Sequence, residues 1–340
     1  MSIRYFTCFT FLYGIILSSS VHVLAADSIA NIKQYNLTLN NEISNSSIKL
    51  LAVGQLTNIS INGLKVSELS GLAWDEDEKI LYTLSDNGYL FHLRPVFNKD
   101  QLIDVQLLAG FALRDENNKP LGGRYADSEG ITIEKNNNGI SGDTTLFICF
   151  EGNPRVVRYY PNGDYINTLT LPDMLSDTTR YHGKNKSLEA ISLHDQYGIL
   201  VGTEYPLKET EQGMLSIFSI QGNDWHVPAI NKDYGALVDM TVLEDGSILL
   251  LERAYTWIWP EFDVTLHRVT LSENDITHEL IVRFAPGNDL FNDNFEGITI
   301  YRNNYLFMIS DDNNHPLKRT LLIYFCMPDR RKTSDECAQH

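Results

Sequence analysis

A short phrase recurs five times along the chain, at intervals of 50 to 60 residues. In each copy a small or acidic residue precedes Gly, Ala or Met and then an aliphatic residue or Thr, and a strand-like run follows. The copies are Ser70-Gly71-Leu72, Glu129-Gly130-Ile131, Glu189-Ala190-Ile191, Asp239-Met240-Thr241 and Glu296-Gly297-Ile298. A repeat of this length indicates an architecture that is built from equivalent units.

Each unit continues with a polar turn rich in Asn, Asp and Gly, and then with a second apolar run. Such turns join antiparallel strands, so every unit begins with a β-hairpin. A third run often follows, as at residues 156–160, 215–220 and 320–325. Units of this size with several short strands are typical of propeller blades, and helical periodicity is scarce. We therefore predict an all-β protein, a β-propeller.

The number of blades is harder to predict from the sequence, because two apolar stretches lie outside the five units. Residues 48–54 would supply a closing strand beside the last unit, and residues 101–113 need a place of their own. We therefore favour six blades, with five or seven as the alternatives.

The first 25 residues have the pattern of a secretory signal peptide. Arg4 precedes an apolar run from Tyr5 to Leu17, and small residues stand at Ala25 and Ala26. The run is short for a membrane span, although an uncleaved anchor is the alternative. We predict a signal peptide at 1–25, a linker at 26–47, a propeller at 48–327 and a tail at 328–340. The cleaved protein is then expected to be secreted or periplasmic, without a membrane span.

Three cysteines follow the predicted signal peptide. Export permits disulfides, so Cys326 and Cys337 could pair and hold the C-terminal tail. Cys149 lies in the apolar run 146–150, where a small buried hydrophobic residue is the better interpretation. The close cysteine spacing of zinc sites is absent from the sequence.

The chain carries 27 Lys and Arg against 44 Asp and Glu, which gives a net charge of −17. A nucleic-acid partner needs a basic face, so this charge argues against that class of function. The hydrophobic content of 43% still provides enough apolar surface for a large core. We expect a monomer that acts on a small-molecule substrate.

Carboxylates occupy two equivalent places in the units, one opening the first strand and one following the second. Both sets are expected to gather near the propeller axis. Their repulsion would raise their pKa values unless cations neutralise them, and Ca²⁺ suits such oxygen ligands. The alternative is that they bond backbone N–H groups of neighbouring blades as structural clasps. The predicted metal ligands are Asp86, Glu129, Glu151, Glu189, Glu204, Glu252, Glu296 and Asp311.

Basic residues beside these acids are candidate substrate ligands, because Arg suits bidentate contact with phosphate or carboxylate. The candidates are Arg124, Arg155, Lys186 and Arg253. An ordinary salt bridge is the alternative for each of them. Glu129, Glu189 and Glu296 are the candidate catalytic residues.

Other catalytic signatures are missing from the sequence. It contains no G-x-S-x-G, H-E-x-x-H, Walker A or G-x-G-x-x-G motif. The nine histidines are scattered, and a solvated role is the better interpretation for His182 and His315 in polar loops.

The ordered set of short phrases carries a resemblance to a known family. The phrases are Leu69-Ser70-Gly71-Leu72, Leu84-Ser85-Asp86, Asp127-Ser128-Glu129-Gly130-Ile131, Glu151-Gly152-Asn153-Pro154-Arg155, Asn185-Lys186-Ser187-Leu188-Glu189-Ala190, Leu251-Glu252-Arg253 and Asn294-Phe295-Glu296-Gly297-Ile298. From about residue 67 to 325 the chain resembles the phytase-like (esterase-like activity of phytase) family. The resemblance implies that Glu129, Glu151, Glu189, Glu204, Glu252 and Glu296 are the family's acidic positions, accompanied by Arg155 and Arg253. Asp239-Met240 departs from the family's usual Glu-Gly or Glu-Ala phrase.

Together the resemblance and the acids predict a calcium-dependent hydrolase of phosphate esters. Ca²⁺ would link the substrate phosphate to the acids, and Arg155, Arg253 and Lys186 would contact its oxygens. One alternative is a calcium-dependent lactonase or carboxylesterase, since a neutral ester needs no arginine set. The other is a non-enzymatic propeller that binds a ligand or a partner protein.

Overall fold

The computed structural model describes residues 27–40, 47–56, 59–256, 261–273, 275–284, 292–327 and residue 337. The predicted signal peptide lies outside these residues, so export stays a prediction. Within the described ranges no helix is both long enough and apolar enough to cross a membrane. The helical segments found there are α1 (Asp173–Ser176) and the 3-10 turns η1 (Gly123–Tyr125) and η2 (Thr178–Arg180).

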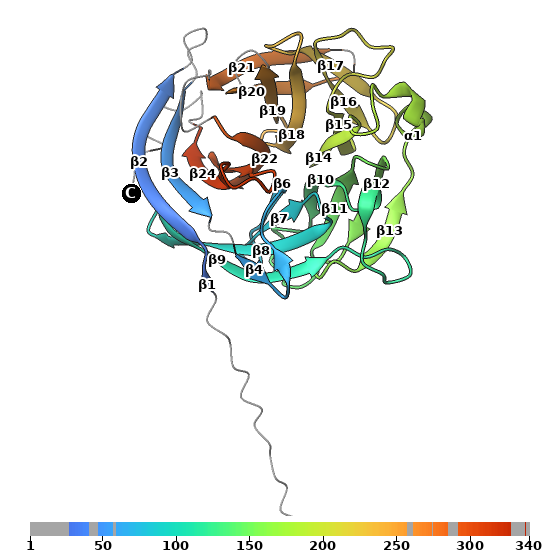
Figure 1. Cartoon of the computed structure of the whole chain (residues 1–340). Coiled ribbons are helices and arrows are strands. Elements are labelled where there is room, and N and C mark those ends of the chain that lie inside the picture. The colour runs from blue at the N-terminus through green and yellow to red at the C-terminus, as the bar shows by residue number, and fades with distance from the viewer. Residues whose placement is uncertain are drawn as a thin grey trace, which may run out of the picture.

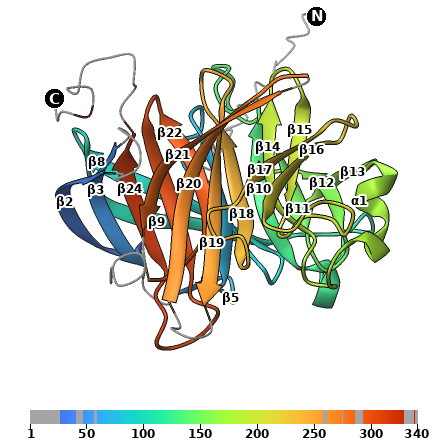
Figure 2. The same ribbon diagram turned by 90° about the horizontal axis from the view of Figure 1, so that it is seen from above.

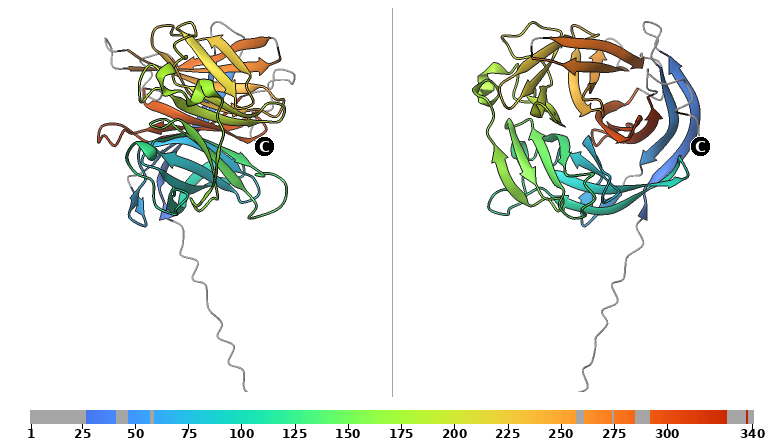
Figure 3. Two further views of the ribbon diagram at one scale, coloured as in Figure 1. Left: turned by 90° about the vertical axis from the view of Figure 1, so that its right-hand side faces the viewer. Right: turned by 180° about the vertical axis from the view of Figure 1, so that it is seen from behind.

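Five antiparallel sheets stand around a central axis, as the blades of a propeller (Figure 1). In each sheet the first strand of the repeat unit is innermost. These inner strands are β6 (Leu69–Asp75), β10 (Ser128–Glu134), β14 (Leu188–His194), β18 (Gly235–Val242) and β22 (Asn294–Arg302). Each inner strand contacts those of the two neighbouring blades, so the ring is closed (Figure 3).

The remaining strands of each blade follow outwards in chain order. The second strands are β7 (Ile80–Ser85), β11 (Thr145–Phe150), β15 (Gly198–Thr203), β19 (Ile248–Thr256) and β23 (Tyr305–Asp311). The outer strands are β8 (Tyr89–Asn98), β9 (Gln101–Ala112), β12 (Arg155–Tyr159), β13 (Tyr165–Leu169), β16 (Met214–Ser219), β17 (Asp224–Pro228), β20 (Glu261–Leu271), β21 (Ile276–Phe284) and β24 (Leu321–Cys326). Figure 2 shows the strands of neighbouring blades side by side.

Both ends of the described chain contribute to the fifth blade. β2 (Ala30–Asn40) pairs with β3 (Ser47–Leu56), and β3 pairs with β24, which gives the strand order β2-β3-β24-β23-β22. In Figure 1 the N-terminal strands (blue) lie beside β24 (red). β1 (Asp27–Ser28) extends the first blade by pairing with β9. These hydrogen bonds join the two ends of the chain and close the ring.

The predicted all-β propeller is confirmed, and five is the blade number among the described residues; the favoured number of six was wrong. Residues 48–54 lie in β3 of the fifth blade, and residues 101–112 form β9 of the first blade. Each stretch pairs with an existing sheet edge, which satisfies its backbone hydrogen bonds without a further blade. The linker predicted at 26–47 is also corrected, because β1 and β2 lie there within two blades. A small hairpin, β4 (Ser60–Ile61) and β5 (Leu64–Lys65), precedes the first inner strand.

Apolar side chains fill the spaces between neighbouring blades. Between the first and second blades Tyr82, Ile131 and Phe150 are buried in one cluster, and further clusters join the other blades. Strands such as β11 are buried at every residue, which explains their continuous apolar runs. Full burial of one Leu or Phe side chain contributes about 1.5–3 kcal/mol, so packing between sheets is the main stabilising contribution.

The small residue of the repeated phrase lets neighbouring inner strands approach backbone to backbone. A Cβ on Gly130 would lie 2.6 Å from the carbonyl oxygen of Glu189 in the next blade. A Cβ on Gly297 would clash with the carbonyl oxygen of Ser70. In the first, second and fifth blades the axis therefore leaves no room for a side chain at this position, which explains the glycine in those three copies of the phrase.

The described cysteines have two different roles. Cys326 and Cys337 form the disulfide that the sequence allowed, and Lys49 Nζ donates a hydrogen bond to the Cys337 carbonyl oxygen at 3.0 Å. The disulfide therefore attaches this part of the C-terminal region to the fifth blade. Cys149 is free and fully buried, as predicted for a small hydrophobic residue.

We expect Gly297→Ala to lower the free energy of unfolding by about 1–3 kcal/mol or more, because the added methyl group meets backbone atoms that cannot move aside locally. Gly122→Ala is the matched control, since a Cβ there has no heavy atom within 4 Å. Urea unfolding of both variants measures the difference. Equal stability of the two variants would contradict close packing at the axis.

Candidate metal centre at the propeller axis

Each inner strand contains a β-bulge that changes the direction of one side chain beside the axis. Each inner strand has one extra residue relative to its hydrogen-bonded neighbour, at the same point in all five blades. Bulges bend a strand and redirect its side chains, and they are common next to functional sites. The equivalent bulge residues are Ser70, Glu129, Glu189, Val238 and Glu296.

In each blade the residue just before the bulge pairs with one residue of the second strand. The next residue along that second strand therefore has the same position in all five blades. These residues are Asp86, Glu151, Glu204, Arg253 and Asp311. In the fourth blade the register differs by one residue from the alignment that the repeated phrase suggested. Val238 and Arg253 therefore take the places expected for Asp239 and Glu252. A shift of one residue turns a strand side chain to the opposite face, so neither acid belongs to the two aligned sets.

Three groups of carboxylates meet near the axis, and in each group one oxygen per residue lies within 4.8 Å of the others. The groups are Asp86, Glu296 and Asp311; Asp127, Glu129 and Glu151; and Glu151, Glu189 and Glu204. We call these eight residues the carboxylate ring. Seven of the eight predicted metal ligands belong to it, and Glu252 does not. Asp127 was not predicted as a ligand. Its position two residues before Glu129, on the same face of an extended chain, was the available signal.

One guanidinium lies within the carboxylate ring. Arg253 Nη1 donates hydrogen bonds to Glu296 and, at 2.6 Å, to Asn294 Oδ1, and Nη2 lies 3.8 Å from Glu204. Burial lowers the pKa of Arg253, but the surrounding carboxylates outweigh burial and raise the pKa above its ordinary value. Arg253 was predicted as a substrate ligand, but here it neutralises part of the ring.

The ring carboxylates are held in an environment that disfavours their ionised form. Burial, followed by the charges of neighbouring carboxylates, raises the pKa of Asp86, Glu129 and Glu189 well above the ordinary range. The same causes raise the pKa of Glu151 to about 8 and that of Asp311 to about 7. One arginine thus leaves most of the negative charge uncompensated, and protons or metal cations must supply the rest.

The donor set fits a hard divalent cation. Asp86 Oδ1 is buried and has no hydrogen-bond donor among the described residues, so an oxygen lone pair is left for another partner. The three groups offer carboxylate oxygens without sulfur or imidazole. Such a set suits Ca²⁺ or Mg²⁺ better than zinc or copper.

Glu252 and Asp239 have the alternative role, as structural clasps. Glu252 accepts hydrogen bonds from the backbone N–H groups of Ile230 and Asn231, and it contacts His267 Nε2 at 2.6 Å. Asp239 Oδ2 accepts from the backbone N–H of Ile298 in the next blade at 2.7 Å. These carboxylates satisfy buried backbone donors, and so they hold loops and blades together.

Arg155, in the second blade, donates its hydrogen bonds to backbone carbonyl groups of the protein. Its Nη1 and Nη2 donate to the carbonyl oxygens of Asn153 and Tyr125 at 3.0 and 2.5 Å. The guanidinium also lies 3.7 Å from the centroid of the Phe150 ring. Burial lowers the pKa of Arg155 to about 10, which still leaves it charged at neutral pH. Its donors are therefore partly used by the fold.

Lys186 and Arg124 keep more of their surface open. Lys186 Nζ donates to Glu204 at 3.0 Å, and its side chain is 42% exposed. Arg124 is exposed, and it donates to the hydroxyl of Tyr125 at 3.2 Å. Of the four predicted basic ligands, these two have exposed surface, and Lys186 lies beside the ring because it contacts Glu204.

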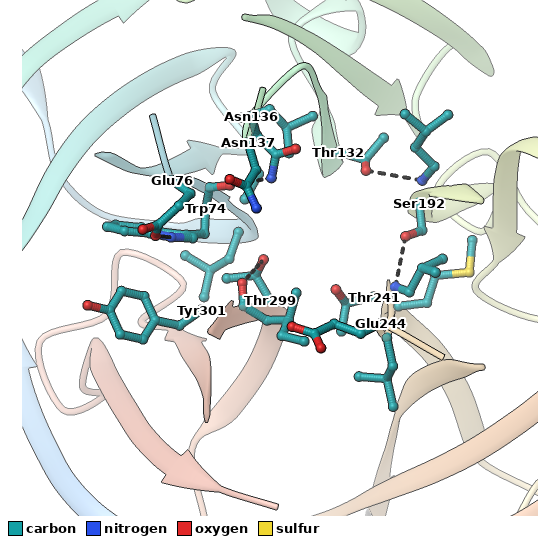
Figure 4. Close-up of a pocket in the computed structure, with 18 of the residues that line it drawn as sticks. Trp74, Glu76, Thr132, Asn136, Asn137, Ser192, Thr241, Glu244, Thr299 and Tyr301 are labelled. Carbon is teal, nitrogen blue, oxygen red and sulfur yellow. Dashed lines mark hydrogen bonds between the residues drawn. The ribbon is translucent and has the colours of Figure 1, made fainter. Parts of the chain in front are cut away.

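The other ends of the inner strands line a separate cavity of about 780 Å³ (Figure 4). Hydroxyl side chains occupy equivalent positions there at Thr132, Ser192, Thr241 and Thr299. Thr132 and Ser192 each accept a backbone N–H of the next blade, so they also join the blades. The inner strands thus present carboxylates at one end of the axis and hydroxyls at the other, where Glu76, Asp195 and Glu244 also line the cavity.

Comparison with known proteins agrees with this geometry. The family model described as phytase-like, esterase-like activity of phytase, matches residues 64–314. The chain belongs to this phytase-like family. The matched residues include the bulges and strand ends that build the carboxylate ring.

The comparisons with solved structures and with curated proteins are less informative. A solved gluconolactonase from Xanthomonas campestris, XC5397, is 11% identical, with a TM-score of 0.44 over 90% of this chain and 99% of that one. At this similarity it carries no argument about activity. No curated protein matches the sequence of this family member.

We expect the stability of the metal-free protein to fall as pH rises from about 4.5 to about 8. Glu151 has an ordinary pKa of 4.5 and a folded pKa of about 8, so in this window the folded state retains a proton that the unfolded chain has released. Linkage then lowers the free energy of unfolding by up to about 1.4 kcal/mol per pH unit for such a group. Urea unfolding in chelator at pH 5, 6.5 and 8 measures it. Glu151→Gln should flatten the slope, and an unchanged slope would count against the raised pKa.

Arg253→Met should destabilise the protein in chelator by about 3–5 kcal/mol, because it leaves buried carboxylates without their cation. Added divalent cation should restore part of this loss. Arg302→Met is the matched control, since Arg302 pairs with Glu76 at the surface and such bridges contribute up to about 1 kcal/mol. If the two variants lose equal stability, Arg253 does not hold the ring together.

Proposed function

We propose that the protein is a calcium-dependent ester hydrolase whose active site is the carboxylate ring. One observation carries this proposal: three groups of carboxylates share the propeller axis with a single guanidinium. The structural clasps Asp239 and Glu252 each accept two backbone hydrogen bonds. In the ring, Glu151 and Asp311 accept one each, from Ser187 and Asn313, and Asp86 Oδ1 has no donor among the described residues. The family's description, esterase-like activity of phytase, supports an ester as the substrate.

Calcium is the favoured ion, because it accepts irregular sets of oxygen ligands. The group of Asp86, Glu296 and Asp311 and the group of Glu151, Glu189 and Glu204 would hold it, and Asp127 and Glu129 would complete a third group. When bound, the ion would polarise an ester oxygen and stabilise the negative charge that develops there.

The chain's own residues would position the ion and transfer protons. Arg253 holds Glu296 and Asn294 in place, and Lys186 orients Glu204. In the metal-free protein Glu151 has a pKa of about 8, so it would hold a proton that cation binding releases. Glu129, Glu189 and Glu296 stand at the bulges, where they would face both ion and substrate.

Phosphate monoesters are the first substrate class to test. The family description names phytase, and Lys186 and Arg124 are cations with exposed surface near the ring. Phosphate oxygens would bind Ca²⁺ and these two side chains rather than Arg155 and Arg253.

A neutral carboxylic ester or lactone is the second class. The specific observation in its favour is that Arg253 is bonded to ring acids and Arg155 to backbone carbonyls. An ester without charge needs no free arginine, and it avoids repulsion by the ring.

The decisive experiment uses the chain from Ala26, purified and stripped of metal with a chelator. We expect Ca²⁺ to raise the melting temperature by several degrees, since a ligand that binds only the native state stabilises it. Hydrolysis of 4-nitrophenyl phosphate and 4-nitrophenyl acetate is then followed in the same samples. Activity should require Ca²⁺ and should fall at least a hundredfold in Glu129→Gln and Glu189→Gln.

Glu244→Gln is the control, because Glu244 is exposed at the opposite end of the axis. It should keep full activity and the full calcium response. Turnover of the phosphate but not the acetate identifies a phosphoesterase, and the reverse identifies the second class. A melting temperature indifferent to Ca²⁺, with no turnover of either ester, would refute the proposal and leave a binding propeller.

A further inference from the structure

A second pocket, of about 480 Å³, lies between the first and fifth blades. It is lined by the end of β3, by the β4–β5 hairpin and by the loop between β23 and β24. Its charged and imidazole lining residues are Lys65, Asp312, His315, Lys318 and Arg319. Three permanent cations thus face one carboxylate, in a chain whose net charge is −17.

Two lysines of this pocket are held together by consecutive asparagines. Lys65 Nζ donates to Asn314 Oδ1, and Lys318 Nζ donates to Asn313 Oδ1. Both asparagines have positive φ, 45° and 49°, a conformation that Asn tolerates better than most residues. The turn therefore places the acceptors of two lysines that are distant in sequence on adjacent residues, and both lysines line the same pocket. Lys318 Nζ also lies 5.6 Å from the centroid of the Phe262 ring in the fourth blade.

Neither ammonium group has a carboxylate within salt-bridge distance among the described residues. Each donates to one amide oxygen among the described residues, and an ammonium group carries three N–H donors. Arg319 differs, because it is paired with Asp293. Lys65 and Lys318 therefore keep both their charge and donor capacity for a ligand.

The pocket is connected to the carboxylate ring through Asn313. The amide that accepts from Lys318 also donates, through Nδ2, to Asp311 of the ring. The Asn313 amide alone separates the Lys318 ammonium from the Asp311 carboxylate. A small molecule can bridge this distance.

We propose that this pocket binds an oxyanionic group of the substrate, such as a second phosphate, while the ester to be cleaved lies at the ring. The inference rests on the proposed function for the identity of the ligand. It assigns to Lys65 and Lys318 the anion recognition that the sequence suggested for Arg155 and Arg253. Paired ammonium groups bind phosphate by charge and by several hydrogen bonds at once.

The pocket also explains how an acidic protein would select an anionic substrate. The carboxylate ring repels anions until cations occupy it, whereas the lysine pair attracts them at the rim. The anionic group would then fix the orientation of the substrate, and the ester would be presented to the ring. This mode of binding favours substrates that carry a second anionic group close to the reacting ester.

The first test measures binding of inorganic phosphate to the metal-free protein by calorimetry in chelator, and it does not depend on catalysis. The double variant Lys65→Gln, Lys318→Gln should weaken phosphate binding at least tenfold. Lys79→Gln is the control, because Lys79 pairs with Glu76 elsewhere on the surface. Equal phosphate affinity of the double variant and the control would overturn the proposed site, as would an absence of phosphate binding by the unaltered protein.

The second test separates this proposal from the proposed function. With Ca²⁺ present, the double variant should raise the KM for a bisphosphorylated ester at least tenfold while kcat and the KM for 4-nitrophenyl acetate stay unchanged. Phosphate binding that is lost in the variant, in a protein without hydrolytic activity, would refute the hydrolase and retain the anion site. Hydrolysis with a KM indifferent to the two lysines would retain the hydrolase and refute the substrate role of the pocket.

Discussion

The close approach of the five inner strands is the constraint on which the rest of the structure depends. Gly71, Gly130 and Gly297 leave backbone atoms of neighbouring blades in direct contact at the axis. This closeness keeps the ring to five blades and brings the residue at each bulge within reach of its counterparts. The carboxylate ring is therefore a consequence of blade packing, since the packing of the inner strands fixes the positions of the acids.

Crowding creates an electrostatic problem that the protein solves only in part. Arg253 replaces the acid that the other four blades supply at the same position, and it is bonded to Glu296. Burial and neighbouring carboxylates raise the pKa values of Asp86, Glu129, Glu151 and Glu189. A site of this kind stores unfavourable free energy in its metal-free state, and cation binding would release it. This is the physical link between the fold and the proposed calcium dependence.

The side chains around the ring have different roles. Glu252 and Asp239 support loops and blades, and Arg155 packs against Phe150, so these residues maintain shape. Lys65 and Lys318 line a separate pocket, and neither has a carboxylate within salt-bridge distance among the described residues. The acid-rich ring and this adjacent pocket would together suit the proposed substrate, an ester that also carries negative charge.

The sequence by itself determined the repeat, the strand content, the disulfide option and seven of the ring carboxylates, because these depend on residue type and local periodicity. Tertiary structure decided the register of the fourth blade, where one residue of displacement replaced Asp239 and Glu252 by Val238 and Arg253. It also decided that residues 101–112 form an outer strand of an existing blade, since pairing with a sheet edge is a contact between segments. Lys65 and Lys318 line the same pocket only because the chain closes into a ring, and no local sequence pattern predicts that they do.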